Sequence, residues 1–282
     1  MPFARTKSAF FGLRHTECAY YFGPIPSFGI AWIVLTIRDV RCTLAQAPLY
    51  FIGAMFVNFL WRGKLMRAAQ WKEGEGAVVV ANHTSSVDPF FVQKACDRVV
   101  HWMIAREFVE HSIWGPMVKI WKVIPANRGG VDTAATREAI RLCENGGLVG
   151  IFPEGRINMT EEFMLNFRPG AAMIAARANV PIVPIYIEGA PFDRFPHTPF
   201  LMPAQVRIYV GTPIRVEDCG DPKKSETLAK AMRMALEQIA TMAGEELFRP
   251  SMAGRNWKPT REETLQVMEE SVRRKRREAK PI

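Results

Sequence analysis

Hydrophobic and polar positions divide the chain into three parts. Two uncharged stretches, 19–37 and 42–61, come first and are separated only by the charged segment Arg38 to Arg41. From Gly76 to Val210, short runs rich in valine and isoleucine alternate with segments of helical periodicity. The rest of the chain contains a helix-prone segment and a strongly basic end. The alternation in the middle part is typical of an α/β domain.

The middle part predicts a mostly parallel central sheet flanked by helices, because its apolar runs look buried on both faces. The predicted strands are Ala77–Ala81, Val99–Ile104, Trp121–Ile124, Leu148–Phe152, Ile182–Ile187 and Val206–Val210. The predicted helices are Pro89–Cys96, Val131–Asn145, Gly170–Ala178 and Ser225–Met242, followed by a last amphiphilic stretch over Arg261–Lys280.

The two N-terminal stretches reach the length of membrane-spanning helices, with 19 and 20 residues. Prolines at 24, 26 and 48 and the short charged connection argue against a spanning pair. We expect a membrane-associated helical segment that lies in the interface. Its rings would sit at the headgroup level and its cations near anionic lipid: Trp32, Tyr50, Phe51, Phe56, Phe59 and Trp61, then Arg62, Lys64 and Arg67. The alternative is a helical pair packed on the domain.

The length of 282 residues allows one full-sized domain with terminal additions. We predict an N-terminal membrane-associating region over 1–62, an α/β domain over 63–245 and a basic helical tail over 246–282. The chain has 37 basic and 28 acidic side chains, a net charge of +9, which indicates an anionic partner: nucleic acid, an anionic membrane or an acidic substrate. Six of the eight residues from 273 to 280 are basic, which suits lipid or nucleic acid but equally a solvated helix end.

Several chemistries find no support in the sequence. The five cysteines lack C-x-x-C spacing, so neither a disulfide framework nor a four-thiolate zinc site is indicated, and a reducing compartment fits best. The chain has no G-x-S-x-G elbow, P-loop or H-E-x-x-H motif. No histidine shows metal-ligand spacing, so we expect no metal.

A histidine and an aspartate lie five residues apart where the first predicted strand ends, in Asn82-His83-Thr84-Ser85-Ser86-Val87-Asp88-Pro89. On one regular helix they would be too far around the axis to meet. If His83 lies in the turn and Asp88 begins the next helix, the carboxylate can fold back on the imidazole and orient it as a general base. The alternative is an N-cap aspartate before proline, with an ordinary loop histidine.

A second polar segment follows the predicted strand that ends at Phe152. Glu154, Gly155 and Arg156 come directly after Pro153, where glycine permits close approach of an anion and arginine can bind phosphate oxygens. An ordinary turn with surface charges is the alternative. Arg106 and Arg128 also follow predicted strands. Because parallel strands end at one sheet edge, these cations should lie at the edge that carries His83, beside a phosphate-bearing substrate.

The blocks together resemble the PlsC-type glycerolipid acyltransferases, which include 1-acyl-sn-glycerol-3-phosphate acyltransferases. His83 and Asp88 resemble the family's H-x4-D pair, and Val123 to Arg128 its second block. Phe152 to Gly155 and Val180 to Ile185 resemble its third and fourth blocks. In this chain Arg156 directly follows Gly155, where the family commonly places a threonine between them, and Lys122 lies near a position that often carries glycine.

The resemblance implies transfer of a fatty acyl group from acyl-CoA or acyl carrier protein to the free hydroxyl of a lysophospholipid, with 1-acyl-sn-glycerol-3-phosphate as acceptor and phosphatidic acid as product. It implies His83 as base and Asp88 as its orienting partner. It also implies phosphate binding by Arg128 and Arg156, with Arg106 where the family often has lysine, and an acceptor loop shaped by Glu154 and Gly155. The thioester is a co-substrate, and no cofactor is expected.

The resemblance also implies where the protein works. We expect a membrane surface as a partner, no nucleic acid, and a catalytic domain on the cytoplasmic side of the membrane. Two alternatives stay open: another lysolipid as acceptor, or a non-enzymatic basic protein that binds lipid or nucleic acid on the same scaffold.

Overall fold

The computed structural model describes residues 46–67, 72, 74–110, 120–127, 133–193, 195 and 197–253. The described residues form a seven-stranded sheet in the order β1-β7-β6-β2-β5-β3-β4. Every neighbouring pair is parallel except β6 and β7, which are antiparallel. The expected mostly parallel α/β sheet is therefore confirmed. The strands are β1 Lys64–Arg67, β2 Ala77–Ala81, β3 Val100–Ala105, β4 Ile124–Ala126, β5 Leu148–Ile151, β6 Ile182–Glu188 and β7 Arg207–Val210.

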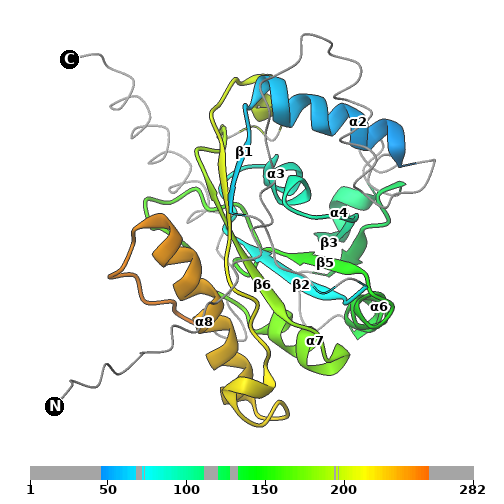
Figure 1. The fold of residues 1–282 in the computed structure, drawn as a ribbon, viewed down its shortest axis with the longest axis vertical. Helices are drawn as coiled ribbons and strands as arrows, with labels where there is room; N and C mark the ends of the chain where they lie inside the picture. The colour runs from blue at the N-terminus through cyan, green and yellow to red at the C-terminus, as the bar shows by residue number, and fades with distance from the viewer. Residues whose placement is uncertain are drawn as a thin grey trace, which may run out of the picture.

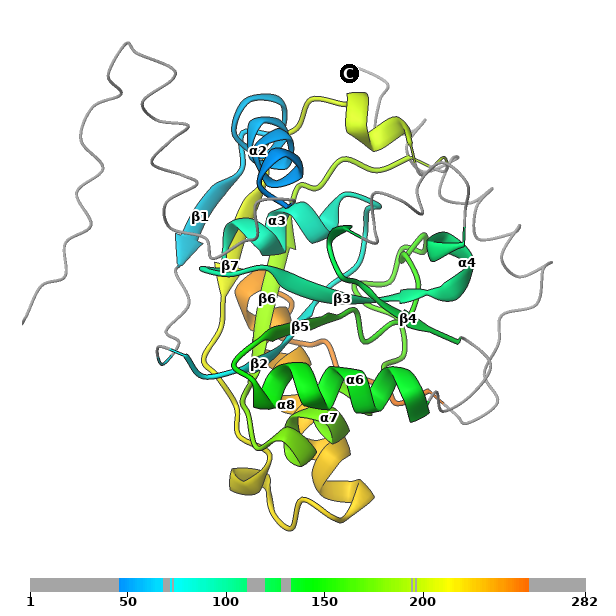
Figure 2. The same ribbon diagram turned by 90° about the vertical axis from the view of Figure 1, so that its right-hand side faces the viewer.

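Helices cover both faces of this sheet (Figures 1 and 2). The α-helices are α2 Ala47–Met55, α3 Asp88–Lys94, α4 Arg106–Val109, α6 Thr133–Glu144, α7 Gly170–Ala178 and α8 Ser225–Ala243. A π-helical turn η1, Phe56–Leu60, continues α2, and two 3₁₀ turns, η2 Thr198–Leu201 and η3 Glu217–Cys219, lie near β7. Figure 2 shows α2 and α3 on one side of the sheet and α6, α7 and α8 on the other.

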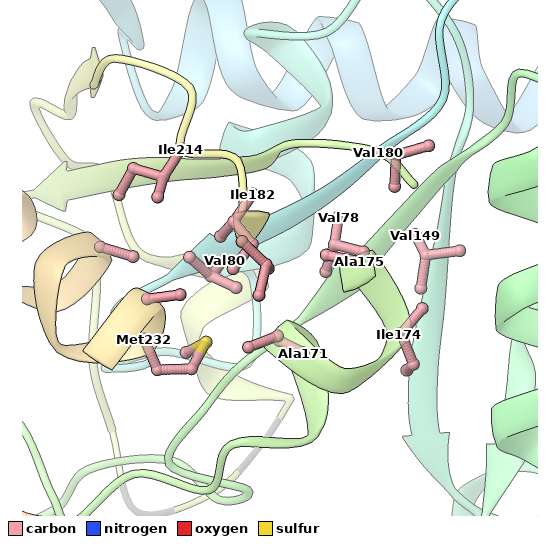
Figure 3. Packing of buried hydrophobic residues seen from close by; sticks show 14 of the residues in the cluster. Val78, Val80, Val149, Ala171, Ile174, Ala175, Val180, Ile182, Ile214 and Met232 are labelled. Carbon is pink, nitrogen blue, oxygen red and sulfur yellow. The ribbon is translucent and has the colours of Figure 1, made fainter. Parts of the chain in front are cut away.

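The period of two along β2 explains how one strand serves both layers. Val78 and Val80 face the layer of α6, α7 and α8, where Ile174 and Met232 belong to the same buried cluster (Figure 3). Val79 on the opposite face joins the cluster under η1 and α3. Because β2 is buried on both faces, its sequence is a continuous apolar run, which is why it could be predicted as a strand.

The structure corrects the prediction near residues 121–126. Trp121 and Lys122 lie in a turn, with Lys122 at φ +51°, and strand β4 begins only at Ile124. A left-handed residue cannot continue a strand. Pro125 is tolerated within β4 because this strand lies at an edge of the sheet, where a missing N–H donor costs no pairing. Apolar content alone could not separate the turn from the strand.

Strand β1 was not predicted. It lies at the opposite edge of the sheet and pairs only with β7, and all four of its side chains are exposed. An exposed four-residue edge strand has neither the alternation nor the apolar run that sequence patterns detect.

The second N-terminal stretch, 42–61, contains buried as well as exposed aromatic side chains. Trp61 is 0% exposed: it donates a hydrogen bond from Nε1 to the Pro199 carbonyl at 3.2 Å and its ring packs against Phe91. Tyr50 is also buried. The prediction that these two rings lie at a lipid boundary is wrong, because they anchor α2 and η1 to the domain. Phe59, in contrast, is 66% exposed.

The rest of the predicted N-terminal segment, 1–45, lies outside the described residues, as do most of the predicted basic tail and Arg128. Among the described helices, none has the length and apolar character needed to cross a bilayer.

The contrast between Trp61 and Phe59 gives a first prediction. Trp61→Ala should lower the free energy of unfolding by about 3–5 kcal/mol, because it empties a fully buried site and removes the indole hydrogen bond to the Pro199 carbonyl. Phe59→Ala, a neighbouring aromatic truncation at an exposed position, should stay within about 0.5 kcal/mol of the unaltered chain. Urea unfolding followed by circular dichroism measures both. Equal effects of the two substitutions would show that the burial of Trp61 is wrongly assigned.

Candidate functional site

His83 lies in the turn that follows β2, at the edge where the parallel strands end. Its Nδ1 is 3.0 Å from Oδ2 of Asp88, and its side chain keeps 15% of its surface exposed. The Asp88 carboxylate is fully buried. The two side chains therefore meet as the spacing predicted, with Asp88 as the first residue of α3. With Nδ1 bound to the carboxylate, the proton-accepting capacity of the ring lies at Nε2.

The carboxylate of Asp88 also holds the backbone of the turn. The Asp88 Oδ2 atom accepts hydrogen bonds from the backbone N–H groups of Thr84 at 2.8 Å and Ser85 at 2.7 Å. The N-cap position of α3 is Val87, and the helix has no side-chain cap. Asp88 thus folds back toward His83 and does not cap α3, which removes the simpler explanation for an aspartate before Pro89.

Burial raises the pKa of Asp88, while the hydrogen bond and the charge of His83 and the two backbone N–H groups act in the opposite direction. Within the described part of the chain, its other oxygen, Oδ1, is buried and has no hydrogen-bond partner. The hydrogen bonds that the carboxylate accepts from His83, Thr84 and Ser85 therefore all fall on Oδ2, the atom that faces the imidazole. An imidazolium formed during a reaction would meet its counter-charge directly.

Glu154 connects the turn of His83 with the loop after β5. Its Oε1 accepts a hydrogen bond from the His83 backbone N–H at 2.8 Å, and its Oε2 accepts one from the Leu165 N–H at 2.9 Å. The pKa of Glu154 is raised to about 8, mainly by burial and also by the charge of Asp88, while the two backbone hydrogen bonds and the charge of Arg156 act in the opposite direction. Glu154 is therefore a buried bridge between the turn of His83 and the loop after β5.

Three more of the predicted residues, Gly155, Arg156 and Arg106, lie at the same edge, while Arg128 lies outside the described residues. Gly155 is exposed at φ +70°, and a Cβ built on it would meet nothing within 4 Å, so its conformation and not lack of space favours glycine there. Arg156 follows it, partly buried, and contributes a favourable charge to Glu154. Arg106 begins α4, is exposed and donates from Nε to Asn127 Oδ1 at 3.0 Å. Strands β2, β5 and β3 are adjacent, so these cations flank His83 on one side.

Sequence patterns did not reveal the residues that bind the His83 turn to the rest of the domain. Asn82 is buried and exchanges two hydrogen bonds with the backbone of Ile187, at 2.9 and 2.8 Å, which ties the turn to β6. The Ser85 hydroxyl donates to the Pro191 carbonyl. The Asn158 backbone N–H donates to the His83 carbonyl at 2.6 Å. The partners of Asn82 and Ser85 lie about a hundred residues away along the chain, and Asn158 lies about 75 residues after His83. No local spacing in the sequence could therefore reveal these contacts.

The loop after β5 is held by the chain beyond α8. The Phe167 N–H donates to the Ser251 carbonyl, and the Ala253 N–H donates to the Phe167 carbonyl, both at 2.9 Å. Phe248 packs edge-on against Phe163 at 5.2 Å between ring centroids. Residues 248–253 therefore stabilise the loop that supplies the Leu165 donor to Glu154.

The described ranges contain no group of three or more His, Cys, Asp or Glu side chains placed to hold a metal ion. Cys96, Cys143 and Cys219 are buried and free. The chemistry that the described site offers is proton transfer at His83 beside arginine side chains.

The raised pKa of Glu154 gives a prediction about stability. The folded chain keeps this proton up to about pH 8, whereas the ordinary value is 4.5, so unfolding releases a proton between those values and stability falls as the pH rises. Glu154→Gln binds no proton and should lose this part of the pH dependence, although one N–H donor then lacks its acceptor. Urea unfolding at pH 5 and pH 8 measures the difference.

Glu161→Gln, an exposed change in the same loop, is the matched control and should keep the pH dependence of the unaltered chain. Parallel stability profiles for the unaltered chain and Glu154→Gln would contradict the raised pKa.

Comparison with known proteins independently supports the resemblance to acyltransferases. A family model described as Acyltransferase matches residues 63–188. The chain is 26% identical over 164 residues to the 1-acyl-sn-glycerol-3-phosphate acyltransferase of Bacillus subtilis (strain 168), covering 58% of this chain and 78% of that protein. It is 27% identical over 160 residues to the enzyme of the same name from Cocos nucifera, covering 52% of this chain and 48% of that protein. The chain thus spans about half the length of the second relative.

The fold has a counterpart among solved structures. The crystal structure of PlsC from Thermotoga maritima, titled a 1-acyl-sn-glycerophosphate (LPA) acyltransferase, superposes with a TM-score of 0.53 at 19% identity. The match covers 76% of this chain and 88% of that chain. At this identity it supports the fold alone. The family match covers residues 63–188, which contain His83, Asp88 and Glu154, so over this segment the chain is similar to the Acyltransferase family.

Proposed function

We propose that the protein transfers a fatty acyl group from the thioester of acyl-CoA or acyl carrier protein to the free hydroxyl of a lysophospholipid. The preferred acceptor is 1-acyl-sn-glycerol-3-phosphate, and the product is phosphatidic acid. The observation that carries the proposal is the His83 imidazole, bound through Nδ1 to the buried Asp88 carboxylate at the edge where Arg106 and Arg156 follow their strands. The names of the relatives support the choice of acceptor.

In the proposed reaction, Nε2 of His83 takes the proton of the acceptor hydroxyl as its oxygen attacks the thioester carbonyl carbon. The new C–O ester bond forms and the C–S bond breaks. The leaving thiolate then takes the proton from the imidazolium, which restores the neutral ring. The buried Asp88 carboxylate stabilises the imidazolium meanwhile. No covalent acyl-enzyme and no bound cofactor take part.

The arginines give the acceptor its orientation in this proposal. Arg128 and Arg156 bind the phosphate, with Arg106 beside them, because guanidinium groups match phosphate oxygens in geometry and charge. Gly155 keeps the acceptor loop open at a left-handed backbone position. Glu154 acts indirectly, by accepting the hydrogen bond of the His83 backbone N–H.

We also propose that the enzyme works at a membrane surface, with its catalytic domain on the cytoplasmic side, and that nucleic acid is not a partner. The segment from α2 to β1 exposes the apolar side chains of Ile52, Phe59 and Met66. Exposed cations lie among them, at Arg62, Lys64 and Arg67. Apolar groups beside cations suit the interface of an anionic bilayer. Both the acceptor and the product are lipids, so docking avoids extracting acyl chains into water.

The catalytic assignment predicts the result of a direct assay. Transfer of a labelled acyl group from acyl-CoA or acyl carrier protein to lysophosphatidate in micelles should fall by about 10²-fold or more in His83→Ala. His197→Ala, which removes an exposed histidine outside the site, should keep the rate of the unaltered chain.

The same assay separates the alternatives. Acylation of another lysolipid but not of lysophosphatidate would keep the mechanism and overturn the acceptor. An unaltered chain that acylates no lysolipid, and binds nucleic acid with a strong dependence on salt, would overturn the enzymatic proposal.

The membrane proposal predicts that Phe59→Glu combined with Met66→Glu weakens binding to vesicles of anionic phospholipid by about tenfold or more, since each change removes an apolar anchor. Leu247→Glu alters a side chain that is even more exposed but lies far along the chain, after α8, and should leave vesicle binding unchanged. Sedimentation with vesicles measures the bound fraction. Equal binding by the double variant and the unaltered chain would exclude this surface.

A further inference from the structure

Three aromatic rings stack in sequence behind the proposed base. The His83 imidazole lies on the Phe152 ring with 3.8 Å between centroids and 7° between planes. The Phe152 ring in turn lies on the Trp102 indole with 4.5 Å between centroids and 14° between planes. His83 and Phe152 lie just after the ends of β2 and β5, Trp102 lies within β3, and these three strands are adjacent in the sheet. Stacking therefore connects the core of the sheet to the imidazole.

The local sequence explains why the indole can occupy this position. Trp102 pairs with Gly150 across β3 and β5, and a Cβ at position 150 would approach the indole to 2.7 Å. Phe152 lies two residues after Gly150 and so on the same face of the strand. The absence of a side chain at Gly150 leaves room for the indole to lie across the strand and reach Phe152. Trp102 is buried, so its ring has little freedom to move.

The stack supplies a restraint that Asp88 cannot. The hydrogen bond at Nδ1 fixes one atom of the imidazole but permits the ring to tilt about that contact. A face-to-face contact at 3.8 Å fixes the plane of the ring. Both restraints are needed to aim Nε2 in one direction. The Phe152 face also stabilises a positively charged imidazole, because the faces of aromatic rings attract cations.

We propose that Trp102 is a positioning residue for acyl transfer, acting through Phe152 on the orientation of the His83 ring. Trp102 contacts no reacting group in this arrangement. The inference rests on the proposed function of His83 as base. It assigns a role to a core tryptophan of β3 that lies outside the motif blocks and would otherwise count only as packing.

Kinetics of two substitutions test the role. Trp102→Leu should lower kcat for lysophosphatidate about tenfold and leave KM within about twofold, because a misaimed base slows the chemical step without weakening acceptor binding. Trp102→Phe, which keeps an aromatic face, should recover most of the loss. Leu236→Ala, a deletion in the buried cluster on the other face of the sheet, should lower thermal stability while kcat of the folded protein stays unchanged.

A spectroscopic readout is independent of activity. Nuclear magnetic resonance is measured on protein labelled at the histidine ring carbons, and the His83 signal is the one that disappears in His83→Ala. Its chemical shift reports the ring current of Phe152. This shift should change in Trp102→Leu and return toward the original value in Trp102→Phe. Gly150→Ala, whose methyl group displaces the indole, should change it in the same way as Trp102→Leu.

The outcomes are distinguishable. If the unaltered chain is active and Trp102→Leu has the same kcat and the same His83 ring shift, the positioning role of Trp102 is wrong and the proposed function stands. If Trp102→Leu and Trp102→Phe lose kcat equally, or if Leu236→Ala loses as much kcat as Trp102→Leu for the same loss of stability, Trp102 acts through packing alone and the proposal is overturned. If the unaltered chain transfers no acyl group to any lysolipid, the proposed function fails whatever the ring shift shows.

Discussion

The site depends on one buried carboxylate. Asp88 places a single oxygen, Oδ2, against the His83 imidazole and the backbone N–H groups of Thr84 and Ser85. A fully buried carboxylate is costly unless hydrogen bonds and an opposite charge compensate it. Desolvation raises the pKa of Asp88, and the His83 contact is the largest effect that lowers it. The turn after β2 and the orientation of the ring are therefore set by the same atom.

A second buried carboxylate has a different part in the site. Glu154 holds the backbone of His83 and of Leu165, and its raised pKa of about 8 means that it carries a proton through most of the neutral range. The two nearby carboxyl groups thus have different partners: Asp88 binds the imidazole, whereas Glu154 accepts hydrogen bonds from backbone N–H groups. Such a division lets one group stabilise a developing imidazolium while the other serves as a neutral brace.

The strands and helices that could be predicted from the sequence are those whose buried side chains recur with the period of a strand or a helix. Helix α7 begins and ends at the predicted residues, Gly170 and Ala178. The meeting of His83 and Asp88 could also be predicted, because their separation is local. Strand β1 could not be predicted because its side chains are all exposed, and the burial of Trp61 depends on Pro199, which is 138 residues away. The stack behind His83 likewise joins residues of three strands, and only the paired register of Trp102 with Gly150 reveals it.

The most direct test of the central claim is kcat/KM for acyl transfer to lysophosphatidate, compared between the unaltered chain and Asp88→Asn. The account predicts that Asp88→Asn lowers kcat/KM by about 10²-fold or more, because the imidazole loses the carboxylate that orients it and stabilises its positive charge. An Asp88→Asn variant within about threefold of the unaltered chain would contradict it.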